Sequence, residues 1–393
     1  MIMKAYISFL VIVFAVIASS CGGGKNSANG LALTEADSLG AAPRYAKGYS
    51  VKVLDNGVRL IDVADPQDDE EKMPVSYHFA LVDKGMDVEV PEGYTKVEVP
   101  IERTLVMTML QLSNFTALDA LDIVRGITGT KNLFNKDIRQ RVKDGRMVKI
   151  GMEGNFDTEL ILAAHPEVIF ISPFKRGGYD AIKETGITLI PHLGYKELTP
   201  LGQAEWIRFV GLFIGKEHEA DSIFAGIEHR YNDLKEKVAN NSHPSQGGAG
   251  EGSPTVFSGE MHGGNWYAVG GKNSLAQIFR DAGARYVFDN DDTGGVNIEF
   301  EEMYAAAANA DYWRILNSYE GDFSYDALKA SEPRNELFKA FKDKKVIYCN
   351  MKQTPYYEKS PVMPDVLLSD LVAIFHPELM PADYEPTFYR MLK

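Results

Sequence analysis

One long helical pattern divides this chain of 393 residues into two halves, and no other feature restricts its fold as much. In the stretch EHEADSIFAGIEHRYNDLKEKVAN, residues 217–240, apolar residues recur every three or four positions and form one stripe on an otherwise charged helix. The stripe consists of Ala220, Ile223, Phe224, Ile227, Tyr231, Leu234 and Val238. At 1.5 Å per residue the helix is about 35 Å long, which is enough to join two separate lobes.

Short apolar strands alternate with helical segments on both sides of this helix. RTLVMTML, VIFIS and TLIPH precede it, and TVFSG, ARYVF, DYWRIL and KKVIYC follow it. This alternation is typical of mainly parallel sheets covered by helices. We therefore predict an α/β fold with two Rossmann-like lobes, residues 101–215 and 255–393, joined by the single long helix 216–240 and a flexible linker 241–254.

The N-terminal residues have the layout of a processing signal. Lys4 is followed by an apolar run over residues 5–18, shorter than the roughly 18 to 20 residues that a membrane-spanning helix needs. The run and the small residues before Cys21 resemble a bacterial lipoprotein signal, although Ala18 stands where a Leu is typical. We expect a signal peptide over 1–20, a membrane anchor on lipidated Cys21 and a flexible Gly/Ser/Asn-rich tether over 21–48. The alternative is an ordinary secretory peptide followed by an incidental cysteine.

Residues 49–100 are expected to form a β-hairpin extension that packs on the first lobe. The stretch YSVKVLDNGVRLIDV alternates around Asp55-Asn56-Gly57, which is a strong hairpin turn signal. A second antiparallel pair is predicted within PVSYHFALVDKGMDVEV.

Charge and cysteine content narrow the classes of partner. A formal net charge of −14 argues against nucleic acid as the main partner and leaves cationic protein surfaces or small molecules. Cys349 lies in KKVIYCN, which has the composition of a buried strand, so we expect no disulfide.

A faint internal repeat relates the two halves. In FDTELILAAHPEVIFIS a Glu stands at the start of a short helix that leads into a strand, and NIEFEEMYAAAANADYWRIL repeats this arrangement. Two similar units indicate a pseudo-symmetric pair of lobes with a cleft between them.

These segments resemble the class III periplasmic substrate-binding proteins of bacterial ABC importers, the group that includes ferric-siderophore, haem and cobalamin binders. The resemblance covers residue 101 to the end and rests on LILAAHPEVIFIS, AEWIRFVGLFIGKEHEAD, GGNWYAVGGKNSLAQIFRDAGARYVF and MPDVLLSDLVAIFHPEL. It departs from the family at Glu167, where Asp is usual. It implies an extracytoplasmic monomer that captures an iron complex, either a ferric siderophore or haem, and delivers it to an ABC permease with its ATPase. A cobalamin receptor and a non-transport surface capture protein are the alternatives.

The resemblance assigns permease docking to Glu159 and Glu301, one carboxylate on the edge of each lobe. Two such charges would orient the receptor on arginines of the permease. The alternative is that both glutamates only favour the N-terminus of a helix, and Glu299 and Glu302 compete with Glu301 for the role.

Ligand is expected between the lobes, at loops that leave the carboxyl ends of the strands. The residues predicted to contact it are Gln111, Ser113, Lys131, Asn155, Phe174, Lys175, Arg176, Tyr195, His262, Trp266, Tyr267, Trp313, Arg314, Lys352 and Tyr356. Such a mixture of aromatic and cationic side chains suits a large, flat, partly anionic metal chelate. Alternatively, Trp266 and Tyr267 fill the core of the second lobe, and Lys175 and Arg176 are solvated loop charges.

Metal and enzyme classes are disfavoured by the motifs. The eight histidines show no pair at metal-ligand spacing, and only His262 is retained as a chelate contact. AVGGKNSL does not complete a phosphate-binding loop, and no nucleophile elbow or zinc-protease motif occurs in the sequence. We expect a receptor that is not an enzyme and has no resident cofactor or metal.

Overall fold

The computed structural model describes residues 42–67, 76–129, 133–152, 155–173, 179–241 and 252–393. The first lobe is built on a five-stranded sheet of order β11-β10-β5-β6-β7 in which all neighbours run parallel. Its strands are β5 (Thr104–Val106), β6 (Val124–Ile127), β7 (Val148–Lys149), β10 (Val168–Ile171) and β11 (Thr188–Pro191). The lobe also contains the short strands β8 (Gly151–Met152) and β9 (Asn155–Phe156) and the helices α1 (Met109–Ala117), α2 (Lys136–Lys143), α3 (Thr158–Ala163) and α4 (Asp180–Lys183).

The second lobe repeats this plan. Its main sheet has the order β15-β12-β17-β18-β19, and only the last pair is antiparallel. These strands are β12 (Thr255–Ser258), β15 (Arg285–Tyr286), β17 (Tyr312–Asn317), β18 (Val346–Asn350) and β19 (Arg390–Met391). A small antiparallel sheet contains β13 (Glu260–His262), β14 (Asn265–Val269) and β16 (Gly295–Ile298), and the helices are α7 (Ser274–Asp281), α8 (Phe300–Ala307), α9 (Tyr325–Ser331) and α10 (Lys339–Lys342). The predicted α/β class with mainly parallel sheets is confirmed.

The internal repeat extends to individual carboxylates. Glu167 directly precedes β10 and accepts hydrogen bonds from the backbone N–H groups of Glu102 (2.6 Å) and Arg103 (2.9 Å), just before β5. Asp311 directly precedes β17 and accepts one from the backbone N–H of Thr255 (2.9 Å), the first residue of β12. Glu167 therefore performs in the first lobe the task that Asp311 performs in the second, and its longer side chain reaches donors one and two residues ahead of the strand.

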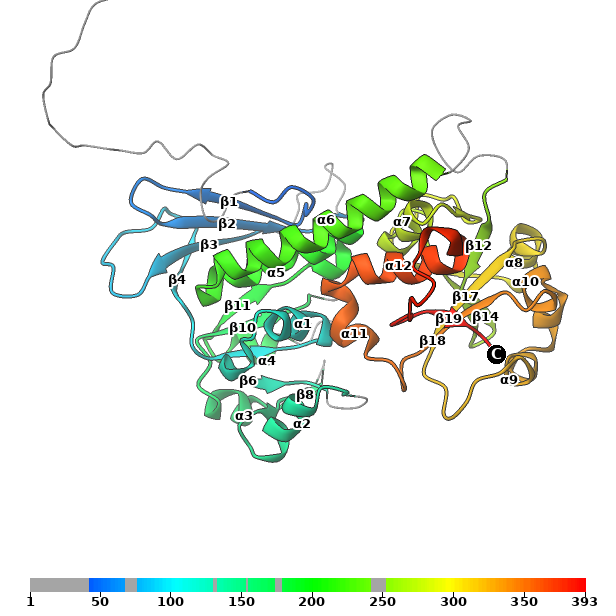
Figure 1. The fold of residues 1–393 in the computed structure, drawn as a ribbon. Helices are drawn as coiled ribbons and strands as arrows, with labels where there is room; N and C mark the ends of the chain where they lie inside the picture. Colours follow the sequence, from blue (N-terminus) through cyan, green and yellow to red (C-terminus); the bar gives the residue numbers. More distant parts are fainter. Residues whose placement is uncertain (1–41, 68–75, 130–132, 153–154, 174–178, 242–251) are drawn as a thin grey trace, which may run out of the picture. The chain divides into compact units, whose positions relative to one another are not determined.

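The long helix predicted from the apolar stripe is α6 (Glu217–Asn241). Its buried residues are Ala220, Phe224, Ile227, Tyr231 and Val238, all members of the predicted stripe. The preceding helix, α5 (Pro200–Ile214), begins after Thr199, whose hydroxyl accepts a hydrogen bond from the N–H of Gly202, and ends at Gly215. Gly215 has φ +67°, a left-handed conformation that glycine adopts without strain. The two helices pack along each other (Figure 1).

A second connection between the lobes was not predicted. After β18 the chain forms α11 (Tyr356–Lys359), the 3-10 turn η4 (Ser360–Val362) and α12 (Pro364–Phe375). Helix α11 packs on α1 of the first lobe, η4 packs on α5, and α12 packs against α6 and α7 (Figure 1). Buried side chains such as Phe209 of α5, Phe279 of α7 and Leu368 of α12 belong to one hydrophobic cluster. The lobes therefore share a core in addition to the long helix.

The N-terminal extension is a four-stranded sheet of order β1-β2-β3-β4. Strands β1 (Tyr49–Val53) and β2 (Arg59–Ala64) form the predicted hairpin, with Gly57 at φ +81° in its turn. The predicted second antiparallel pair is wrong, because β3 (Ser76–Asp83) runs antiparallel to β2 and parallel to β4 (Thr95–Val99). The chain between β3 and β4 is a crossover, whose residues Met86, Val88 and Val90 pack against a small apolar cluster of this sheet.

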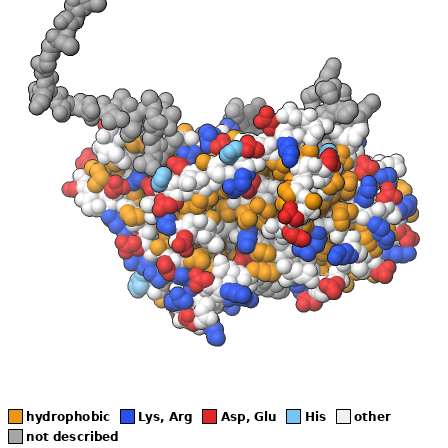
Figure 2. Space-filling view, in the orientation of Figure 1, with side chains coloured by type: hydrophobic (Ala, Val, Ile, Leu, Met, Phe, Trp, Pro, Cys, Tyr) orange, Lys and Arg blue, Asp and Glu red, His pale blue; other side chains and the backbone are white. Residues whose placement is uncertain are grey.

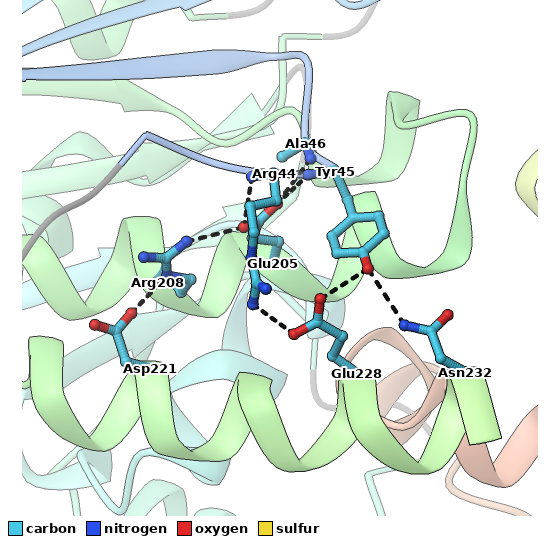
Figure 3. Close-up of polar contacts among 8 residues, drawn as sticks. All are labelled: Arg44, Tyr45, Ala46, Glu205, Arg208, Asp221, Glu228 and Asn232. Carbon is cyan, nitrogen blue, oxygen red and sulfur yellow. Dashed lines mark hydrogen bonds and ion pairs between the residues drawn. The ribbon is translucent and has the colours of Figure 1, made fainter. Parts of the chain in front are cut away.

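Two buried carboxylates fasten the start of the extension to α5, and we call this arrangement the N-terminal clamp. Glu205, on α5, accepts hydrogen bonds from the backbone N–H groups of Arg44 (2.9 Å), Tyr45 (2.7 Å) and Ala46 (2.9 Å) (Figure 3). Glu197 accepts hydrogen bonds from the next two backbone N–H groups, those of residues 47 and 48, and from the Trp206 indole. Residues 44–48, assigned above to the flexible tether, are therefore held in place.

Several segments predicted from the sequence are not part of the described structure. The signal peptide 1–20, Cys21 and tether residues up to 41 lie outside the described residues, as do linker residues 242–251. Acidic and basic side chains are interspersed over the face seen in Figure 2. Charged side chains also form ion pairs, such as Arg141 with Asp122 (2.6 Å) and Asp137 (2.9 Å).

Candidate functional site

The first-lobe side of the predicted cleft lies where β5, β10 and β11 end. The helix that follows β5 begins with a capping box. The Thr108 hydroxyl accepts from the backbone N–H of Gln111 (3.2 Å), and the side-chain oxygen of Gln111 accepts from the backbone N–H of Thr108 (3.2 Å). The Gln111 amide also accepts from the N–H of Met107 (2.7 Å) and donates to the Ser172 hydroxyl (3.0 Å). Gln111 is fully buried, so in this structure it positions the ends of β5 and β10 instead of presenting its amide to a ligand.

The other residues of the first lobe that were predicted to contact ligand do not gather at one place among the described residues. The Tyr195 hydroxyl donates to the carbonyl of Pro173 (3.1 Å), which ties the loop after β11 to the loop after β10. Ser113 is buried and donates to the carbonyl of Leu110 (2.7 Å), whereas Asn155 is exposed on β9. Lys131, Phe174, Lys175 and Arg176 lie outside the described residues. The cations predicted for this side of the cleft are therefore not placed, and their contacts stay predictions.

The second lobe presents a group of exposed tyrosines at the carboxyl ends of its strands and on the adjoining small sheet. Tyr267 on β14, Tyr319 after β17 and Tyr357 on α11 have 52%, 39% and 47% of their area exposed. The Tyr357 ring packs edge-on against the ring of Tyr356, with 5.3 Å between the ring centroids. We call Tyr267, Tyr319 and Tyr357 the tyrosine face.

Polar groups accompany the tyrosine face. The Glu260 carboxylate accepts a hydrogen bond from the Asn317 amide (3.2 Å), whose oxygen accepts one from the Tyr348 hydroxyl (2.9 Å). Burial raises the pKa of Glu260, and the Asn317 hydrogen bond and the nearby Arg314 guanidinium counter part of that rise. His262 is exposed on β13 beside this carboxylate. The surface therefore combines aromatic rings with groups that accept and donate hydrogen bonds.

Four of the ligand contacts predicted in the second lobe prove to be interior residues, namely Trp266, Trp313, Arg314 and Tyr356. Trp266 and Trp313 have no exposed area, and their indole N–H groups donate to the carbonyls of Ser258 (3.0 Å) and Gly259 (2.8 Å). Together with Phe257 they fill the core of the second lobe, so the ligand contact expected of them is replaced by packing.

Arg314 and Tyr356 are also buried, and they form a chain behind the tyrosine face. The Arg314 Nε–H donates to the Tyr389 hydroxyl (3.0 Å), which bonds to the Tyr356 hydroxyl (3.0 Å). These two residues support the exposed Tyr357 from within. Lys352 is half-buried and paired with Glu320, so its charge is already compensated.

Glu159 and Glu301 occupy the same position in their helices. Asp157 caps α3 and Glu299 precedes α8, so each predicted docking residue is the second residue of its helix. Glu159 is exposed, and the Glu301 side chain is 77% exposed while it contacts Arg334 (3.1 Å). The equivalence distinguishes Glu301 from its neighbours Glu299 and Glu302 and fits a two-point contact by corresponding surfaces of the lobes. Their docking role stays a prediction.

Sequence reasoning missed residues that join the lobes. Glu358 of α11 accepts hydrogen bonds from the backbone N–H groups of Phe134 (2.6 Å) and Asn135 (2.9 Å) in the first lobe. Beside it lies a cavity of about 410 Å³ that Ser113 also lines. A larger cavity, about 610 Å³, lies between the extension and the strands β10 and β11. Nothing local in the sequence marks Glu358, because its partners are more than 200 positions away.

The described residues show neither a metal site nor a membrane span. Across 42–67, 76–129, 133–152, 155–173, 179–241 and 252–393, no group of three or more His, Cys, Asp or Glu side chains could hold a metal ion. Within the same ranges, no helix has both the length and the apolar character needed to cross a membrane.

Comparison with known families identifies the class of this two-lobed chain. The family described as Periplasmic binding protein matches residues 108–352, more than half of the sequence, and the chain belongs to that family. Its fold is that of the class III substrate-binding proteins of ABC importers, as the sequence predicted. The family is a class of extracytoplasmic transport proteins that bind substrates and do not catalyse a reaction.

The chain is also similar to individual proteins in sequence or in fold. The chain is 27% identical over 303 residues to an uncharacterized lipoprotein of Methanocaldococcus jannaschii, and the match covers 73% of this chain and 68% of the relative. A periplasmic heme binding protein from Pseudomonas aeruginosa has a similar structure, with a TM-score of 0.57 at 18% identity over 74% of this chain and 97% of that one. The periplasmic vitamin B12 binding protein of Vibrio cholerae gives a TM-score of 0.51 at 11% identity over 72% of this chain and 99% of that one.

Proposed function

We propose that this protein is a lipid-anchored receptor that captures an iron complex, a ferric siderophore or haem, between its lobes. It delivers that cargo to an ABC permease driven by a separate ATPase, and it works as a monomer held to the membrane through Cys21. Support for the anchor comes from the sequence before Cys21 and from the relative named as a lipoprotein.

The observation that carries the choice of cargo is the tyrosine face. Three exposed aromatic rings on one lobe offer flat surfaces against which a large conjugated or aromatic chelate can pack. The hydroxyl groups and the adjoining Glu260 and His262 can orient such a ligand by hydrogen bonds. A structure with the same fold is named as a heme binder, which favours iron complexes as first choice.

Cobalamin is the second candidate, because its corrin ring is also large and flat and because a structure with the same fold is named as a vitamin B12 binder. Capture at the cell surface without transport remains the third reading, and it needs neither a permease nor docking by Glu159 and Glu301.

The test is to purify the protein from native membranes and record the visible spectrum and mass of the bound compound. A Soret band identifies haem, a corrinoid spectrum identifies cobalamin, and a charge-transfer band identifies a ferric chelate. If none co-purifies, haemin, cyanocobalamin and a ferric hydroxamate are titrated into the protein. Binding of none of the three would refute the proposal.

A matched pair of variants tests whether the tyrosine face forms the site. Tyr267→Ala should weaken binding of whichever probe binds by about fivefold or more, because an aromatic contact of this kind contributes about 1 to 3 kcal/mol. Leu162→Ala, which removes an equally exposed apolar side chain from α3, should leave the affinity unchanged. Equal effects of the two changes would show that the tyrosine face is not the site.

A further inference from the structure

One side chain of the N-terminal extension bonds to both lobes. The Gln67 amide nitrogen donates to the backbone carbonyl of Lys196 (2.6 Å), in the 3-10 turn η2 (Gly194–Lys196) of the first lobe. The Gln67 amide oxygen accepts a hydrogen bond from the Thr293 hydroxyl (3.1 Å), which belongs to the second lobe between β15 and β16. Its partners lie 129 and 226 positions away in the sequence. A donor and an acceptor on one amide group therefore connect the two halves of the molecule.

The extension that carries Gln67 is fixed to the helices α5 and α6. The N-terminal clamp holds residues 44–48 on α5. The Tyr45 hydroxyl donates to Glu228 on α6 (2.7 Å), and Arg59 of β2 pairs with Glu217 at the start of the same helix (2.7 Å). The extension is thus bound to both helices at the junction of the lobes.

The two residues that bond to Gln67, Lys196 and Thr293, are each held within their own lobe by further hydrogen bonds. On the first-lobe side, the backbone N–H of Lys196 donates to the carbonyl of Leu193 (2.8 Å), and its ammonium group pairs with Asp65 of the extension. On the second-lobe side, the carbonyl of Thr293 accepts from the side-chain amide of Asn273 (2.8 Å), the capping residue of α7. A movement of one lobe relative to the other therefore has to break or stretch a Gln67 bond.

The turn η2 that Gln67 holds also carries Tyr195, a predicted ligand contact. The Tyr195 hydroxyl is bonded to the carbonyl of Pro173, so Gln67 touches the same loop that borders the predicted cleft. The family match begins at residue 108, so the extension lies outside the matched region.

We propose that the N-terminal extension is an interlobe latch, in which Gln67 bonds the first lobe at Lys196 and the second lobe at Thr293 and limits how far the lobes separate. The latch acts in addition to the shared core and α6. This inference depends on the two-lobed fold and not on the identity of the cargo.

The test measures the distance between the lobes in the full chain, solubilised in detergent without added ligand. Nitroxide labels on Lys183→Cys of α4 and Lys329→Cys of α9 report on one lobe each, since both side chains are more than half exposed. Cys349 is buried and should not be labelled. Pulsed electron–electron double resonance then gives the distribution of interlobe distances.

Gln67→Ala removes both bonds, and Thr293→Val removes only the bond to the second lobe while keeping the shape of the side chain. Each should raise the ratio of separated to closed molecules by about fivefold, the factor that one ordinary hydrogen bond contributes to an equilibrium. Gln140→Ala is the matched control, because the Gln140 amide donates to Asp144, the residue that caps the end of its own helix (2.6 Å).

The outcomes distinguish the latch from other effects. A shift to longer distances in both latch variants, with a wild-type distribution in Gln140→Ala, supports it. Wild-type distributions in both Gln67→Ala and Thr293→Val would overturn it. A shift in Gln67→Ala alone would also overturn it, because the change would then come from loosening the extension and not from the bond to the second lobe.

Discussion

The N-terminal clamp should make Glu205→Gln one of the most destabilising conservative changes in the chain. Glu205 is fully buried, and each carboxylate oxygen accepts two hydrogen bonds. One oxygen accepts from the N–H of Arg44 and the Arg208 guanidinium, both at 2.9 Å, and the other accepts from the N–H groups of Tyr45 and Ala46 (Figure 3). Whichever oxygen becomes the amide nitrogen of glutamine, two donors lose their acceptor.

The magnitude follows from this count. A hydrogen bond to a charged group contributes about 1.5 to 3 kcal/mol, so two of them amount to about 3 to 6 kcal/mol. Removing a buried charge recovers part of its desolvation cost, and Arg208 keeps its second partner, Asp221 (2.5 Å). We expect the free energy of unfolding to fall by about 3 kcal/mol.

Urea unfolding followed by circular dichroism measures this loss, and hydrogen exchange of residues 44–46 shows whether the clamp itself has opened. Glu228→Gln is the control, because Glu228 lies on the neighbouring helix and bonds only to side chains, those of Arg44 and Tyr45. It should cost less than about 1 kcal/mol. If Glu205→Gln costs no more than this control, the reasoning about the clamp is wrong.

Three further predictions concern docking, acid stability and thiol reactivity. Changing both Glu159 and Glu301 to Lys should stop delivery to the permease without changing the affinity for cargo. The control Glu302→Lys, on the same helix as Glu301, should transport normally. A large loss of affinity in the double variant would contradict the docking role. Burial alone would raise the pKa of Asp311, but hydrogen bonds from a lysine and a threonine lower it from 3.8 to about 2. The ionised Asp311 carboxylate therefore stabilises the fold fully above pH 3.8, and this contribution is lost as the pH falls towards 2. The free energy of unfolding is measured by urea unfolding at pH 6 and at pH 3. Since a third of the Asp311 side chain is exposed, Asp311→Asn should make the fall in this free energy between the two pH values smaller by only about 1 kcal/mol. The same fall in the variant as in the wild type would refute this. Burial raises the pKa of the Cys349 thiol to about 11, so a thiol reagent at pH 8 should modify it only after unfolding, and rapid reaction of the native protein would count against the buried position.

The parts of the fold that follow from local periodicity were predictable. The α6 stripe is set by residues three and four positions apart, and the hairpin of the extension is set by a turn signal between two alternating runs. The pairing of β3 with β4 was not predictable in this way. Met86, Val88 and Val90 alternate like a strand, but they pack against apolar residues of the sheet while the chain crosses to a parallel neighbour.

The candidate site shows the same limit. Trp266 and Tyr267 are adjacent on β14, so the alternation of a strand places them on opposite faces. Which of the two faces the core depends on Phe257, Trp313 and Phe338, residues that the sequence does not bring near them. The bonds made by Gln67 and Glu358 are beyond local reasoning for the same reason, since each joins segments more than a hundred positions apart.

The N-terminal clamp also determines where mechanical load enters the molecule. A pull on the chain ahead of Arg44 is received by the Glu205 carboxylate and by Glu197 next to it. Because only Gly215 and Lys216 separate α5 from α6, this load passes to the two helices between the lobes and bypasses the tyrosine face.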